Sequence, residues 1–160
     1  MIATLSEPPG EIERFRANPW EFQRTFRTPL KDLKNFVATA LSQFTLEAGA
    51  LTTYEIVFEP DTLLELMTSN SIHVENRWKF ILRAVGQQSI AEMLEATLAC
   101  WIDFAFVPTP EFFAIYADHD EYTTFYARND STLRNLGSRL ELAGFEPVNG
   151  YERPCGDCWK

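Results

Sequence analysis

The segment 112–127, FFAIYA-DHDE-YTTFYA, decides which fold this sequence predicts. Two runs rich in aromatic and β-prone residues, 112–117 and 122–127, flank the polar tetrapeptide Asp118–Glu121. Aromatic and β-branched residues favour strands, and a short polar stretch between two such runs favours a turn. The pattern therefore predicts a β-hairpin that turns at Asp118–Glu121.

The register of this hairpin determines which side chains share a face. Side chains alternate between the two faces of a strand, and we take Ala117 to pair with Tyr122. One face then carries Phe112, Ala114, Tyr116, Thr123, Phe125 and Ala127, and the other carries Phe113, Ile115, Tyr122, Thr124 and Tyr126. Both faces are largely apolar, so we expect the hairpin either to lie inside the fold or to hold one face against a partner.

The residues that follow the hairpin predict a helix and a returning strand. Asn129–Ser131 is a cluster of helix-capping residues, and Leu133, Leu136 and Leu140 follow at helical spacing. Gly144 is a typical helix end. The extended segment 145–151 is expected to return as a third strand beside the hairpin.

The N-terminal half reads mainly as helices. Apolar residues recur at three- and four-residue steps from Leu30 to Phe44, and similar spacing marks the stretches 74–85 and 89–105. A shorter helix follows Pro60, another helix is indicated after Asn18, and a short strand is indicated around 53–58. The expected fold class is α+β: a helical N-terminal half packed on a small antiparallel sheet formed mainly by the C-terminal β-hairpin–helix–strand unit.

Length and composition favour one soluble domain. The chain has 160 residues, of which 46% are hydrophobic, and we expect a single domain over 1–160 with a flexible segment at 1–10 and a C-terminal tail at 152–160. No stretch approaches ~18 consecutive apolar residues, and the N-terminus lacks the pattern of a signal peptide. Three cysteines are too few for a disulfide scaffold. The expected location is cytoplasmic, without membrane association.

The charge balance argues against a nucleic-acid partner and favours a basic protein. Fourteen basic residues against 23 acidic ones give a net charge of −9. Nucleic-acid binding usually needs a basic stripe that releases counterions, and none is visible. An excess of carboxylates suits a basic protein partner better than a polyphosphate.

The polar turn contains the first group of candidate catalytic residues, Asp118, His119, Asp120 and Glu121. A histidine flanked by carboxylates can act as a general base, or can join carboxylate oxygens around a divalent metal ion. Adjacent residues in a tight turn usually point in different directions, and polar residues are also what a structural turn requires. The alternative role is recognition, and the candidate binding residues are Tyr116, His119, Tyr122, Thr124 and Tyr126.

The second candidate is the pair Cys155 and Cys158, whose spacing suits tetrahedral zinc or a reversible disulfide. Zinc needs about two further ligands, and the remaining soft or imidazole donors are Cys100, His73 and His119. Cys100 stands in an apolar stretch and is expected to be a buried thiol. Zinc held between two chains, each contributing its cysteine pair, would satisfy the geometry. No other cofactor is expected.

Three hypotheses about function follow. The leading one is a small acidic cytoplasmic domain that binds another protein through the hairpin, for example as an inhibitor or immunity-type partner of a basic protein. The second is an enzyme or small-ligand binder with a pocket near the Asp118–Glu121 turn. The third is a homo-oligomer linked by zinc or a disulfide through Cys155 and Cys158.

Overall fold

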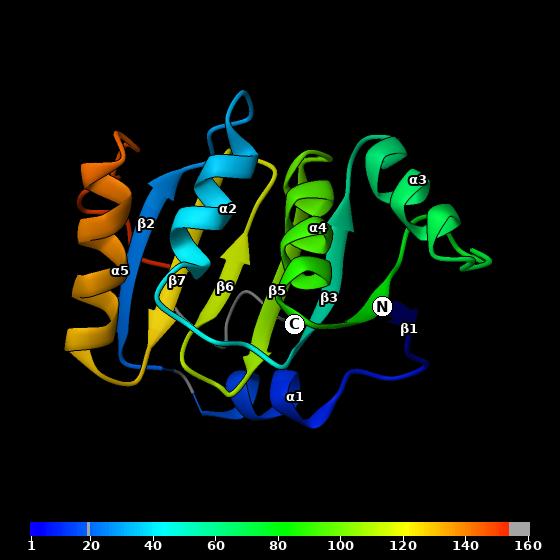
Figure 1. The fold of residues 1–160 in the computed structure, drawn as a ribbon, viewed down its shortest axis with the longest axis horizontal. Coiled ribbons are helices and arrows are strands. Elements are labelled where there is room, and N and C mark those ends of the chain that lie inside the picture. Colours follow the sequence, from blue (N-terminus) through cyan, green and yellow to red (C-terminus); the bar gives the residue numbers. More distant parts are fainter. Residues whose placement is uncertain (19, 154–160) are drawn as a thin grey trace.

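A single antiparallel sheet of seven strands organises the part of the chain that the computed structural model describes, residues 1–18 and 20–153 (Figure 1). The spatial order of the strands is β1-β4-β3-β5-β6-β7-β2, so the two edges are β1 and β2. The strands are β1 (Ile2–Thr4), β2 (Phe22–Arg27), β3 (Ala48–Ile56), β4 (Ile81–Val85), β5 (Ile102–Thr109), β6 (Ala114–Ala117) and β7 (Tyr122–Ala127).

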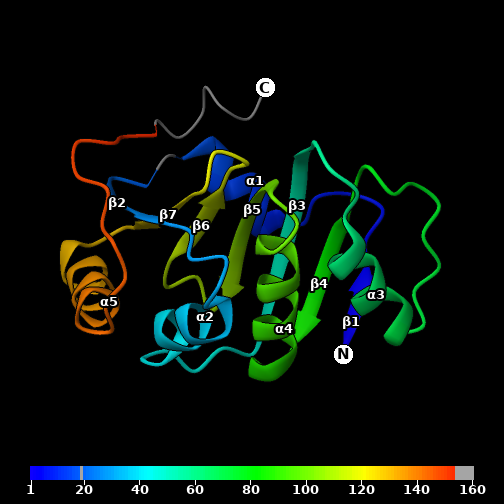
Figure 2. The ribbon, with the colours of Figure 1, turned by 90° about the horizontal axis from the view of Figure 1, so that it is seen from above.

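Helices cover both faces of the sheet, but unequally. They are α1 (Gly10–Ala17), α2 (Leu33–Leu41), α3 (Asp61–Ser69), α4 (Gln87–Leu98) and α5 (Asp130–Leu142). Figure 2 shows α2, α3, α4 and α5 on one side of the sheet and α1 on the opposite side. We call these the four-helix face and the α1 face. Among the described residues, no helix combines the length and apolarity needed to cross a bilayer.

The four-helix face holds the larger core, which is rich in phenylalanine. Phe125 of β7 contacts Phe36 of α2 with ring centroids 6.0 Å apart, and Phe36 contacts Phe145 at 5.1 Å. Phe104 and Phe106 of β5 point into the same core and are fully buried. Burying aromatic side chains supplies a large part of the free energy of folding, since each removes a large apolar area from water.

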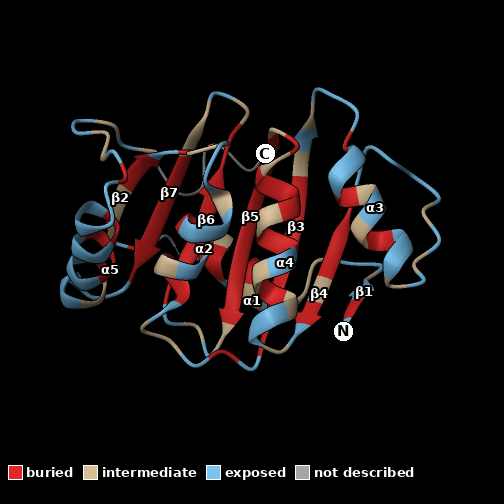
Figure 3. Ribbon diagram, turned by 45° about the horizontal axis from the view of Figure 1, so that its top comes forward, coloured by how far each residue is buried: buried red, intermediate tan, exposed pale blue. Residues whose placement is uncertain are grey.

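The α1 face holds a second, smaller core. Phe15 of α1 packs edge-to-face against Trp20 and Tyr126, in both cases with ring centroids 5.3 Å apart. Ala105 and Tyr116 from the central strands complete it and are buried. The central strands are therefore buried on both faces, as the colouring by burial shows (Figure 3).

The expectation of a helical N-terminal half on a small C-terminal sheet is wrong, because four of the strands come from segments 1–85 and a fifth is β5. The segment 81–85 forms β4 rather than the end of a helix, and the helix expected over 89–105 ends at Leu98 before β5 begins. β5 is buried at almost every position. A continuous apolar run of this kind has no alternation and cannot be distinguished from a buried helix by periodicity.

Several local predictions are confirmed. Helices α2 and α3 form in the segments expected to be helical, although α2 ends at Leu41. The side chain of Asn129 accepts a hydrogen bond from the backbone N–H of Thr132 at 2.8 Å and caps α5. Gly144 follows α5 with φ of 93°, a conformation that favours glycine. These signals depend on a few adjacent residues, so tertiary packing does not override them.

The β6–β7 hairpin is also confirmed, but with its register shifted by one residue. Ala117 is paired with Thr123, not with Tyr122, and the backbone N–H of Asp118 donates to the carbonyl of Tyr122 at 3.0 Å. The loop is thus three residues long, and Glu121 adopts φ of 70° at its end. The shift places Tyr116 together with Thr124 and Tyr126 on the α1 face.

Other boundaries differ from the expectations as well. The segment 1–10, expected to be flexible, contains β1, which pairs with β4. The helix expected after Asn18 is replaced by β2, and β2, not the segment 145–151, lies beside the hairpin. In that segment an isolated bridge joins Pro147 to Phe26 of β2. The edge strand is covered at this point, which protects it from pairing with another chain.

Gly49 lies inside β3, where the absence of a side chain leaves room for a buried ring. A Cβ atom at this position would lie 2.3 Å from Cε2 of Phe106, which is fully buried and cannot move aside. We predict that Gly49→Ala lowers the free energy of unfolding by about 1–3 kcal/mol, measured by urea denaturation.

The matched control is Gly10→Ala at the start of α1. Its Cβ would meet only the flexible end of the Arg14 side chain, at 2.9 Å. This variant should unfold at nearly the wild-type urea concentration, because alanine also favours the helix. Equal destabilisation by the two substitutions would contradict the packing of β3 against Phe106.

Candidate functional site

The candidate site lies on the α1 face, at the end of the sheet where β3 and β6 finish and β5 begins. Glu55 of β3 is directly opposite Asp103 of β5 in the register. The β6–β7 turn brings His119 to the same place, because its backbone N–H donates to Asp103 Oδ1 at 2.7 Å. Three separate segments therefore contribute one side chain each to this end of the sheet.

A β-bulge brings Glu55 beside Asp103. The pairing between β3 and β5 is regular up to Thr53 and Phe104, and then skips Tyr54 so that Glu55 is opposite Asp103. Residues directly opposite in a sheet share a face. An extra residue in one strand re-aims the side chains that follow it, and such bulges are common beside functional sites.

Asp103 and His119 form a closely bonded couple. The distance from Asp103 Oδ1 to His119 Nδ1 is 2.8 Å, and the hydroxyl of Tyr116 donates to Asp103 Oδ2 at 3.3 Å. Asp103 is 6% exposed, whereas the side chain of His119 is 34% exposed. The carboxylate is thus held within the protein while part of the imidazole faces water, an arrangement that orients a histidine for proton transfer or metal binding.

The carboxylates around His119 raise its pKa above the ordinary value of 6.5. The hydrogen bond to Asp103 makes the largest contribution, burial opposes it, and the negative charges of Asp103, Asp120 and Glu55 add to it. A raised folded-state pKa stabilises the fold below the unfolded-state pKa, and this contribution disappears as the pH rises through the folded-state value. The couple therefore makes the protein more stable on the acidic side of neutrality than it would be without Asp103.

Glu55, Asp103 and His119 also have the composition and spacing of a metal-binding group. Each offers one ligand atom, and the three atoms lie within 4.8 Å of one another. Glu55 is exposed, His119 is half-buried and Asp103 is buried, so the group opens to solvent on one side. Oxygen and imidazole donors at this separation can close around one divalent ion with small side-chain movements.

Asp118 does not join this group, although it is adjacent to His119 in sequence. Its Oδ1 accepts the backbone N–H groups of Asp120 and Tyr122 at 3.0 and 3.2 Å. Its Oδ2 accepts from Arg153 Nη1 at 2.5 Å and from the Tyr151 hydroxyl at 3.2 Å. Asp118 is 8% exposed, so its carboxylate serves to fix the turn and to hold the segment that contains Arg153.

Arg153 ties this carboxylate to the ring system of the α1 face. Its guanidinium carbon lies 3.9 Å from the centroid of the Tyr116 ring, and its Nη2 donates to the Tyr116 hydroxyl at 3.0 Å. Burial raises the pKa of Tyr116 strongly, and the negative charge of Asp103 adds to this effect although Arg153 opposes it. Tyr116 therefore stays protonated and acts as a hydrogen-bond donor to Asp103.

The remaining predicted catalytic residues lie at the surface of the turn. The side chain of Asp120 is 75% exposed, and its Oδ1 is 3.9 Å from His119 Nε2. Glu121 Oε2 is 4.0 Å from Arg27 Nη1, and this ion pair is also exposed. The four polar residues of the turn thus diverge, and only His119 reaches the group with Glu55 and Asp103.

The predicted binding residues are mostly covered. Tyr116, Thr124 and Tyr126 are 2%, 1% and 0% exposed. The hydroxyl of Thr124 bonds to that of Thr25 at 2.8 Å, and the hydroxyl of Tyr126 donates to the carbonyl of Arg153 at 3.0 Å. The side chains of Tyr116, Thr124 and Tyr126 are accordingly enclosed within the protein.

Of the predicted binding residues, Tyr122 and His119 retain partial exposure.

Cys100 is buried, as expected for an inert thiol, and burial raises the pKa of its thiol. Cys155 and Cys158 lie outside the described residues.

Sequence reasoning missed Asp103 and Glu55. One signal for Asp103 was present, because a single charged residue interrupts the apolar run Ile102–Val107. A charge in such a run must find partners, and it often marks a site. No local signal identifies Glu55, since its position depends on a bulge in the pairing of two strands.

Comparison of the chain with protein-family models, with curated proteins and with solved structures finds no significant match. The geometry of the described side chains is therefore the basis for a functional proposal.

The coupling of Asp103 to His119 predicts a specific pH dependence. An NMR titration should place the pKa of His119 above 6.5, and Asp103→Asn should lower it, because the amide removes the negative charge next to Nδ1. The stability advantage of the wild type over His119→Gln should be largest below pH 6.5 and should shrink as the pH rises through the folded-state pKa. A His119 pKa that is unchanged by Asp103→Asn would contradict the coupling.

Proposed function

We propose that this protein binds a divalent transition-metal ion, with zinc as the best fit, through Glu55, Asp103 and His119. The observation that supports this most directly is that one donor atom from each of the three residues lies within 4.8 Å of the other two. The residues come from β3, β5 and the β6–β7 turn, so the fold has brought them together across the sheet.

The chemistry of the donors favours zinc and its first-row neighbours. Two carboxylates with one imidazole suit Zn²⁺, Mn²⁺ or Co²⁺, whereas Ca²⁺ and Mg²⁺ prefer oxygen ligands alone. Three protein ligands also leave room in the coordination shell for water or a substrate atom. The site is thus compatible with a metal that acts on a small molecule, in line with the hypothesis of a small-ligand binder at the turn.

The surroundings of Asp103 provide rigid support for a ligand. The backbone N–H of His119 and the hydroxyl of Tyr116 both donate to its carboxylate, and Tyr116 is held in turn by Arg153. Hydrogen bonds to a ligating carboxylate fix its orientation and reduce the cost of binding a metal. Glu55, which is exposed, is the ligand that must become ordered when the ion binds.

Zinc titration by calorimetry tests this proposal. The starting protein should be Cys155→Ser/Cys158→Ser, because that pair is itself a candidate for zinc. We expect one zinc ion per chain, and we expect Asp103→Asn and His119→Gln each to weaken binding by at least about tenfold. Binding should also weaken below the His119 pKa, since protons compete with the metal for the imidazole.

Two matched variants control for nonspecific loss. Asp120→Asn removes an exposed carboxylate 3.9 Å from the same histidine, and His73→Gln removes the other imidazole of the chain. Both should leave the affinity within about twofold of the starting protein, because neither residue belongs to the group of three. The site would be refuted if the Cys155→Ser/Cys158→Ser protein bound no zinc. It would also be refuted if Asp103→Asn, His119→Gln, Asp120→Asn and His73→Gln all weakened zinc binding equally.

A further inference from the structure

The described surface contains a groove that is separate from the metal-binding group. Residues of α3 and α4 line it, together with Leu33 at the start of α2; Figure 1 shows these three helices on the same face of the sheet. Its apolar lining comes from Leu33, Leu66 and Ala96. Ala96 is buried and the two leucines are partly buried, so the apolar surface that the groove exposes comes mainly from Leu33 and Leu66. Apolar surface of this kind often marks a site of interaction.

Carboxylates surround this apolar strip. Glu65 of α3 and Glu92 and Glu95 of α4 line the same groove. Glu92 accepts a hydrogen bond from Gln88 at 3.0 Å, and among the described residues none of the three carboxylates forms an ion pair with a basic side chain. Three carboxylates that form no ion pair within the described part of the chain thus lie beside an apolar strip, which favours a cationic occupant.

The composition of the two helices strengthens this charge pattern. Neither α3 nor α4 contains a lysine or arginine. Glu95 lies in the last turn of α4, where the helix dipole is negative and cations are favoured. A basic residue supplied from outside would lie against the Glu95 carboxylate beside the negative end of the helix dipole.

We propose that the groove binds a basic amphipathic helix from a partner protein. Its apolar residues, repeated at helical spacing, would pack on Leu33, Leu66 and Ala96, and its lysines or arginines would lie against Glu65, Glu92 and Glu95. Helix-in-groove recognition uses this combination of apolar anchors and flanking charges. The net charge of −9 would speed the approach of such a partner. The proposal does not depend on metal binding.

A designed peptide can test the groove directly. The probe is a fluorescein-labelled amphipathic helix with leucines on one face and lysines flanking them, and its binding is followed by fluorescence anisotropy. Leu66→Gln and the triple variant Glu65→Gln/Glu92→Gln/Glu95→Gln should each weaken binding by at least about tenfold. Amide hydrogen exchange should slow in α3 and α4 when the peptide binds.

The control must separate local recognition from the overall negative charge. Glu7→Gln/Glu21→Gln/Glu75→Gln removes three exposed carboxylates outside the groove and changes the net charge by the same amount. This protein should bind the peptide within about twofold of the wild type, and a peptide with glutamates in place of the lysines should not bind.

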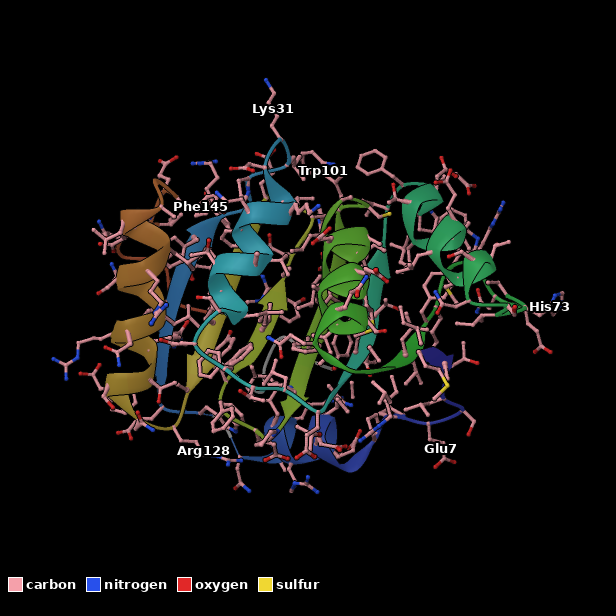
Figure 4. All side chains as sticks on the ribbon, viewed as in Figure 1. Glu7, Lys31, His73, Trp101, Arg128 and Phe145 are labelled. Atoms are coloured by element: carbon pink, nitrogen blue, oxygen red, sulfur yellow. The ribbon has the colours of Figure 1, made fainter. Side chains whose placement is uncertain are left out.

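Either of two results overturns the proposal. One is the absence of binding by the wild-type protein, and the other is an equal loss of affinity in the two triple variants. Circular dichroism of each variant distinguishes loss of the groove from loss of the fold. Figure 4 draws the side chains of α3 and α4 as sticks on the ribbon, in the orientation of Figure 1.

Discussion

Burial of the central strands on both faces is the constraint on which the rest of the structure depends. Residues of β5 point alternately into the phenylalanine-rich core under α2 and α4 and into the core under α1. A carboxylate in such a strand must be compensated, because an isolated buried charge is very costly. Asp103 meets this requirement through the N–H groups of His119 and the hydroxyl of Tyr116.

The functional proposal follows from how this one buried charge is satisfied. The partners that stabilise Asp103 also fix the imidazole of His119, while the bulge in β3 aligns Glu55 with them. The second carboxylate of the region, Asp118, is neutralised by Arg153 and remains outside the group. The two carboxylates thus have different roles. Asp118 fixes the turn and binds Arg153, whereas Asp103 orients His119, whose imidazole is partly exposed to water.

How much could be predicted from the sequence depends on how local each signal is. The hairpin and α5 follow from turn and capping residues such as Asn129 and Gly144, which act within a few positions. The sequences of β4 and β5 resemble helices, because strands buried on both faces lose their alternation of apolar and polar residues. The sequence predicts the Asp118–Glu121 turn, whereas the carboxylates that lie beside its histidine come from β3 and β5. Neither the bulge at Tyr54 nor the register beyond it has any local signature.

The central claim is that the sheet brings Glu55, Asp103 and His119 around one point in space. Anomalous diffraction at the zinc edge, from crystals of the Cys155→Ser/Cys158→Ser protein grown with zinc, tests it most directly, because it locates the metal independently of any affinity. The account predicts a single strong peak per chain at bonding distance from the three side chains, with Asp118 still bonded to Arg153. A peak at any other position in the molecule, or an empty site beside well-ordered side chains, would contradict it.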